Sequence, residues 1–154
     1  MSSIHDRCKL KDITYFVSIH ATESKDKVLL ALRNLFPEEI RDEIEIKEKR
    51  NIGHAGNPII VAQCTITKKA LTRKIMSYYQ QKMTASDKEW LNRKFEIRTS
   101  EDNCLYLRFD KQKAYHDEIA LAVDDNTIIV VMKFIIYKDE PGLLKKTIES
   151  FGLI

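Results

Sequence analysis

The sequence is poor in the residues that build linkers, disulfides and simple metal sites. Only 4 Gly, 3 Pro and 3 Cys occur among 154 residues. This leaves little room for a linker, and the absence of any Cys-x-x-Cys pair argues against a structural zinc site or a disulfide framework. The thiols of Cys8, Cys64 and Cys104 are therefore expected to be reduced, in a cytoplasmic protein. With no signal-type start and no apolar run near 18 residues, we expect neither secretion nor membrane insertion.

Motifs that carry catalysis are also lacking. The Walker pattern and the dinucleotide fingerprint are absent. Cys64 and Cys104 fall in predicted strands and are expected to be small core residues. His20, at the end of a predicted strand, fits a general base or a ligand, but a satisfied structural role is more common for a lone His. No catalytic residue, metal ligand or cofactor is predicted.

Charge is abundant but nearly balanced. The chain has 26 basic and 23 acidic residues, a net charge of +3, with 32% charged and 44% hydrophobic residues. This is a globular composition with a charged exterior. The balance is too even to require a polyanionic partner, so a nucleic-acid role has to come from clustering of the basic residues.

Apolar periodicities predict an order of strand, helix, two strands, two helices, three strands and helix. Short links favour a mainly antiparallel sheet with helices packed on one face, an α+β fold. Residues 1–10 are polar and expected to be flexible, and residues 11–154 are expected to form one domain. The expected strands are 13–19, 43–49, 59–66, 104–110, 118–123 and 127–137, and the expected helices are 24–36, 68–82, 86–95 and 141–151.

The stretch 104–115 combines a strand with a dense polar group. Leu105, Leu107 and Phe109 alternate with polar residues, and the apolar alternation then stops at Asp110. The polar group at the end of this strand, called the rim here, has two interpretations. It is either a recognition surface or a solvated strand end with ordinary ion pairs. The candidate contacts on this rim are Arg108, Lys111, Gln112 and Tyr115.

Residues 50–58 concentrate turn residues between two expected strands. Gly53 and Gly56 have the spacing of the KH-domain clamp, but that clamp joins two helices. The glycines allow backbone N–H groups to converge on an anion, with Arg50 and His54 close enough to help. A hairpin loop that needs two positive-φ residues explains the same pattern.

Basic residues cluster at the start of the helix expected at 68–82. Lys69 and Arg73 are four residues apart and fit a shared contact with phosphate. A solvated helix surface is the alternative. The full set is Lys68, Lys69, Arg73 and Lys74.

Three segments, 20–34, 53–59 and 105–115, together resemble the archaeal RNA-binding-domain family described as predicted exosome subunits. The third segment, Leu-Tyr-Leu-Arg-Phe-Asp-Lys-Gln-Lys-Ala-Tyr, is the most specific, and the likeness runs from about Thr14 to the C-terminus. The chain departs from the usual pattern at Ala55, where a second His is common, and at Phe109, where Leu is frequent. The first departure argues against a metal or acid–base role for the loop.

The resemblance implies a fold similar to that of the ribosomal large-subunit protein that binds 5S RNA. It also implies an RNA-linked, non-catalytic role beside the RNA-processing machinery. We therefore expect an accessory protein that binds RNA and is associated with the exosome. The alternative is a protein-interaction module that docks on a partner subunit without touching RNA.

Each candidate contact has an expected role. Arg and Lys meet phosphate, Gln and Asn bond base edges or ribose, and Tyr115 stacks on a base. The expected RNA contacts are Arg50, His54, Asn57, Lys68, Lys69, Arg73, Lys74, Arg108, Lys111, Gln112 and Tyr115.

Overall fold

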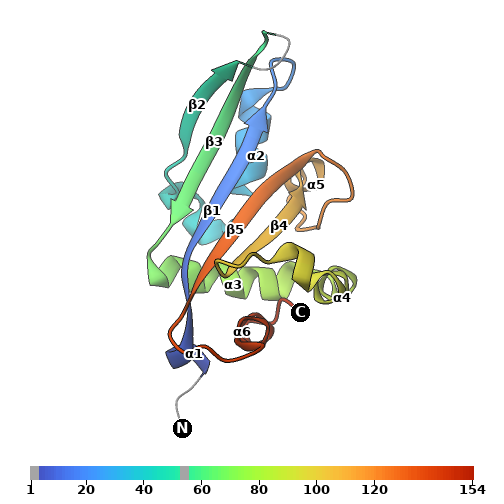
Figure 1. Ribbon diagram of the computed structural model, residues 1–154. Coiled ribbons are helices and arrows are strands. Elements are labelled where there is room, and N and C mark those ends of the chain that lie inside the picture. The colour runs from blue at the N-terminus through green and yellow to red at the C-terminus, as the bar shows by residue number, and fades with distance from the viewer. Residues whose placement is uncertain (1–3, 53–55) are drawn as a thin grey trace.

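The computed structural model describes residues 4–52 and 56–154, and its secondary structure is that of an α+β protein (Figure 1). The strands are β1 (Cys8–Ile19), β2 (Lys47–Ile52), β3 (Pro58–Ile66), β4 (Cys104–Asp110) and β5 (Thr127–Ile136). The helices are α1 (Ile4–Arg7), α2 (Lys25–Arg33), α3 (Lys69–Lys82), α4 (Ala85–Arg93), α5 (Lys111–Tyr115) and α6 (Leu143–Ser150), with 3-10 helices η1 (Glu38–Glu43) and η2 (Phe95–Arg98).

The strands form one antiparallel sheet in the order β2-β3-β1-β5-β4. Strand β1 is central, and its Tyr15 lies opposite Cys64 of β3 and Val130 of β5. Helices α2 and α3 lie behind the sheet in Figure 1, and β2 and β3 form a long hairpin at its upper end. The α+β fold with a mainly antiparallel sheet is thus confirmed.

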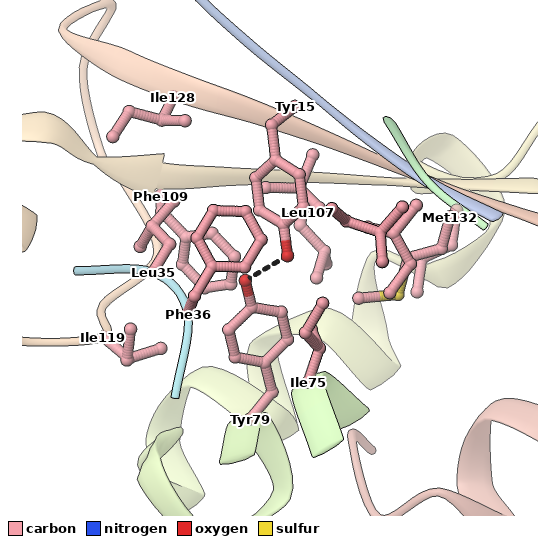
Figure 2. Close-up of a cluster of buried hydrophobic side chains, with 14 of the residues drawn as sticks. Tyr15, Leu35, Phe36, Ile75, Tyr79, Leu107, Phe109, Ile119, Ile128 and Met132 are labelled. Atoms are coloured by element: carbon pink, nitrogen blue, oxygen red, sulfur yellow. Dashed lines mark hydrogen bonds between the residues drawn. The ribbon is translucent and has the colours of Figure 1, made fainter. Parts of the chain in front are cut away.

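The core lies between the sheet and the helices, and two tyrosines tie the layers together (Figure 2). Tyr15 of β1 and Tyr79 of α3 are both 0% exposed, and their hydroxyl groups are hydrogen-bonded at 2.7 Å. Burial raises the pKa of both hydroxyls, so each remains protonated. The rings of Phe36 and Phe109 pack against this pair. A polar contact placed among rings in this way fixes the layers without leaving an unsatisfied group.

The central strand begins earlier than its sequence suggests. Residues 1–10 were expected to be flexible, yet α1 covers Ile4–Arg7 and β1 starts at Cys8, which is buried. Cys8 pairs with Ile136, and a register shift between Leu10 and Asp12 interrupts the regular pairing. This bulge breaks the alternation in the sequence, and the pairing partners lie more than 120 residues away.

Two other predicted strands differ from the structure. The strand expected at 43–49 is present as β2 but begins only at Lys47, because η1 and the buried Ile44 first fill the core. Residues 118–123 make a single bridge, between Phe109 and Leu121, in place of a strand. Since α5 first diverts the chain from β4, it returns only for this short contact.

Helix starts follow capping chemistry. Ser24 accepts a hydrogen bond from the N–H of Lys27 at the start of α2, as expected. Helix α4, expected from residue 86, begins at Ala85, because the Thr84 side chain accepts a hydrogen bond from the N–H of Asp87.

Candidate nucleic-acid interface

The sheet has one covered face and one open face. Outward positions on three neighbouring strands give the open face an apolar strip, defined here as Phe16, Val61, Ile129 and Val131, all half-buried. Phe16 lies opposite Gln63 on one side and Ile129 on the other. A solvent-facing sheet with an aromatic ring near its centre can receive stacked bases or a partner's apolar side chains.

Basic side chains surround the apolar strip. Lys47 and Lys49 of β2 and Arg108 of β4 are exposed, and Lys133 of β5 is half-buried. In residues 4–52 and 56–154, none of the four has a carboxylate within 4 Å. Asp12, an acidic residue on the same face, pairs with Lys133 in the strand register.

A trough of about 1030 Å³ runs along the β2–β3 side of this face. Phe16 and Gln63 line it together with three lysines, Lys47, Lys49 and Lys68. Three glutamates also line it, of which Glu48 is bound to Lys25 at 2.7 Å. The trough is therefore mixed in charge, and its basic side chains lie mainly on β2.

Lys111 does not lie on a recognition rim. It is only 6% exposed, and its ammonium donates to the carbonyl of Ser18 at 2.9 Å. Both carboxylate oxygens of Glu23 also accept from it, at 3.3 Å. The folded chain therefore already pairs this charge, which argues against the predicted phosphate contact of Lys111.

The same arrangement changes the pKa of the Glu23 carboxyl. Burial disfavours the charged carboxylate, but the N–H of His20 and the ammonium of Lys111 favour it more strongly. Together they leave the pKa of Glu23 lowered. We call Lys111, Glu23 and Ser18 the Lys111 corner, which joins α5 to the end of β1.

The rest of the predicted rim forms a helix in place of a strand end. Asp110 caps α5, its Oδ1 accepting from the N–H of Lys113 at 2.8 Å. Tyr115 is half-buried with the Lys27 ammonium over its ring, and Gln112 is exposed and lies 3.4 Å from His116. Arg108 instead lies on the open face.

The hairpin residues are exposed at the far end of the sheet. Arg50 lies in β2, Asn57 precedes β3, and Gly56 has a φ of 76° that favours glycine. His54 lies outside the described residues. The pairing of Ile52 with Pro58 confirms the predicted hairpin.

The four basic residues at the start of α3 are exposed. Lys69 and Arg73 line one cavity of about 550 Å³, while Lys68 lines the trough. In Figure 1 the α3 start, the β2–β3 tip and α5 lie in three separate places. The predicted contacts therefore do not form one patch.

Sequence reasoning missed part of the open face. Lys47, Lys49 and Lys133 lie in strands whose neighbours could not be assigned from spacing. Phe16 did carry a signal, because an aromatic residue interrupts the otherwise polar outward positions of its strand.

The cysteines and acidic residues show no reactive arrangement. Burial raises the pKa of the Cys64 thiol to about 12, so it is protonated at neutral pH and packs as an apolar group. Within the described ranges, no three His, Cys, Asp or Glu residues gather as metal ligands. None of the described helices is long and apolar enough to cross a membrane.

Fold and surface define an α+β protein whose antiparallel sheet has one helix-covered face and one open, basic-edged face. A family model described as RNA binding matches residues 12–134, which include nearly all five strands. The chain belongs to this RNA-binding family.

Archaeal relatives agree with this assignment. The chain is 37% identical over 116 residues to RNA-binding protein PAB1135 of Pyrococcus abyssi, covering 75% of each chain. It is 34% identical over 131 residues to protein MJ0213 of Methanocaldococcus jannaschii, covering 83% of this chain and 87% of that one.

A solved structure has the same fold. The crystal structure of protein AF2318 from Archaeoglobus fulgidus is 27% identical and superposes with a TM-score of 0.82, over 93% of this chain and 99% of the other.

Proposed function

We propose that the protein binds single-stranded or irregular RNA on the open face of its sheet and has no catalytic activity. The observation that carries the proposal is the family match, which spans the strands that form this face. The relative PAB1135, which is named an RNA-binding protein, supports it.

The chemistry of the open face suits RNA. Bases stack on Phe16 while phosphates meet Lys47, Lys49 and Arg108, and such stacking contributes about 1–3 kcal/mol per base. Asn51 and Gln63, which also line the trough, supply hydrogen bonds to base edges or ribose. Asn57 extends this surface toward the hairpin tip, whereas Arg50, next to Lys49 in β2, points to the opposite face of the strand.

With few phosphate contacts, affinity is expected to be modest. Fluorescence anisotropy with labelled single-stranded RNA should give a Kd around micromolar at low salt. It should weaken with a log–log slope of about −0.7 for each phosphate engaged.

A pair of double variants tests the location of the interface. Lys49→Gln with Arg108→Gln should weaken binding and reduce the salt slope. The control, Lys82→Gln with Lys94→Gln, removes the same charge from exposed positions at the ends of α3 and α4 and should leave both unchanged.

If the wild-type protein binds no RNA pool at low salt, the RNA proposal fails. The protein-interaction alternative would then account for the apolar strip, and pull-down of a folded partner subunit would test it. The resemblance to predicted exosome subunits supports a narrower proposal. In this proposal the protein is an accessory factor of RNA processing or degradation in the cytoplasm.

A further inference from the structure

A second cavity, built from both ends of the chain and the start of α3, adjoins the trough, with which it shares Thr67. It has a volume of about 550 Å³, within the roughly 300–1,000 Å³ typical of small-molecule sites. We call it the terminal pocket. Its lining residues come from α1, the start of β1, α3 and the C-terminal end of α6. Helices α1, α3 and α6 lie at the lower end of Figure 1. Its lining is His5, Lys9, Leu10, Thr67, Lys69, Thr72, Arg73, Met76 and Phe151.

The terminal pocket has an apolar floor. Met76 is buried and Leu10 is half-buried, and the hydroxyl of the neighbouring buried Thr72 donates to the carbonyl of Lys69 at 3.1 Å. The ring of Phe151 stands beside that of His5, with 5.5 Å between the ring centroids, and also packs on Phe134. An anchored ring above an apolar floor provides a surface on which a planar base can lie.

The exposed rim of the terminal pocket is basic. Lys69 and Arg73 lie one turn apart on α3, and Lys9 comes from β1. The described lining contains no carboxylate. In the part of the chain that the structure describes, neither Lys69 nor Arg73 has a carboxylate within 4 Å.

The positive charge of the rim favours a phosphomonoester over an internal RNA phosphate. An internal RNA phosphate carries one negative charge, whereas a phosphomonoester carries about −1.5 to −2 at pH 7. Lys69 and Arg73, which have no carboxylate within 4 Å among the described residues, suit the more highly charged group, and Arg adds paired donors.

We propose that the terminal pocket binds a nucleoside phosphomonoester, as found at a phosphorylated end of an RNA chain. Lys69 and Arg73 hold the phosphate, and the base lies on Phe151 and the apolar floor. The proposal rests on the RNA-binding function but places a second contact outside the open face. Four of its lining residues, His5, Lys9, Leu10 and Phe151, lie outside the residues matched by the family model.

The test uses the full chain and RNA octamers of one sequence, carrying a 5′-phosphate, a 3′-phosphate or neither. One phosphorylated octamer should bind at least about tenfold more tightly than the unphosphorylated one, as expected for charge-assisted hydrogen bonds. The double variant Lys69→Gln with Arg73→Gln should lose this preference. The matched control, Lys82→Gln with Lys94→Gln, should keep it.

Two further experiments identify the source of the phosphate and the role of the Phe151 ring. Competition by AMP alone at the same site would support the pocket but assign it to free nucleotides. Phe151→Leu should reduce the preference for the phosphorylated end in protein whose thermal unfolding is unchanged.

The outcomes separate this proposal from the general function. Equal binding of all three octamers, without displacement by AMP, overturns the terminal pocket and leaves RNA binding intact. Binding of AMP without any octamer overturns the RNA proposal and supports the pocket. Absence of all binding overturns both.

Discussion

Two lysines that occupy the same position in the secondary structure differ completely in burial. Lys111 is the first residue of α5 after β4, and Lys69 is the first residue of α3 after β3. Lys111 is buried against Ser18 and Glu23, whereas Lys69 is exposed on the rim of the terminal pocket. The fold therefore decides whether such a lysine stabilises the chain or remains available to a ligand.

The largest expected effect is on the buried lysine. Lys111→Met keeps the aliphatic stem but leaves Glu23 and the Ser18 carbonyl without their donor. Because Glu23 is partly exposed, we expect a loss of about 2 kcal/mol in the free energy of unfolding. Urea unfolding measures it, and Lys113→Met, at an exposed position of α5, should cost no more than about 0.5 kcal/mol. Equal losses of stability in the two variants would contradict the comparison.

A smaller loss in the free energy of unfolding is expected when the cap of α5, Asp110, is removed. Asp110→Ala removes the acceptor for the N–H of Lys113 and should cost about 1 kcal/mol in thermal or urea unfolding. Asp110→Asn keeps a side-chain oxygen and should recover most of it. If both variants have wild-type stability, the cap does not contribute to holding α5.

The pH dependence of stability tests the interaction of Lys111 with Glu23, because the carboxylate of Glu23 titrates. The lowered pKa of Glu23 means that its contribution is present above the ordinary glutamate range of about 4.3 and is lost as the pH falls through the lower folded-state value. Unfolding followed from pH 7 downward should show this component in the wild type. It should be absent in Glu23→Gln, and an unchanged profile in that variant would assign the acid sensitivity to other carboxylates.

The smallest stability effect is expected at the exposed lysine and its neighbour on α3. Lys69→Gln with Arg73→Gln should change the free energy of unfolding by less than about 0.5 kcal/mol. RNA binding should respond instead, with a salt slope smaller by about 0.7 for each phosphate that the variant no longer engages. A large loss of stability in urea would show that these residues also hold the fold.

Much of the architecture could be predicted from the alternation of apolar residues. Leu105, Leu107 and Phe109 were expected to share one face, and all three are buried. The start of β1 at Cys8 could not be predicted, because a bulge hides the alternation and β5 supplies the partners.

The candidate site was less accessible to sequence reasoning. The basic cluster at the start of α3 is exposed as predicted, yet only Lys69 and Arg73 share the terminal pocket. The predicted RNA contacts at Gln112 and Tyr115 remain predictions. Only the pairing of β1 with β3 and β5 placed Phe16 within an apolar strip.

Local sequence was sufficient to specify which side chains face inward, where most helices begin, and the family likeness. These depend on neighbours within a few residues, because side-chain direction and capping repeat over one or two turns or pleats. Tertiary packing was needed for the neutralisation of Lys111 by Glu23, 88 residues away, and for the joining of His5, Lys69 and Phe151 around one pocket. Such contacts depend on how the sheet and helices pack, since spacing along the chain does not specify partners so distant.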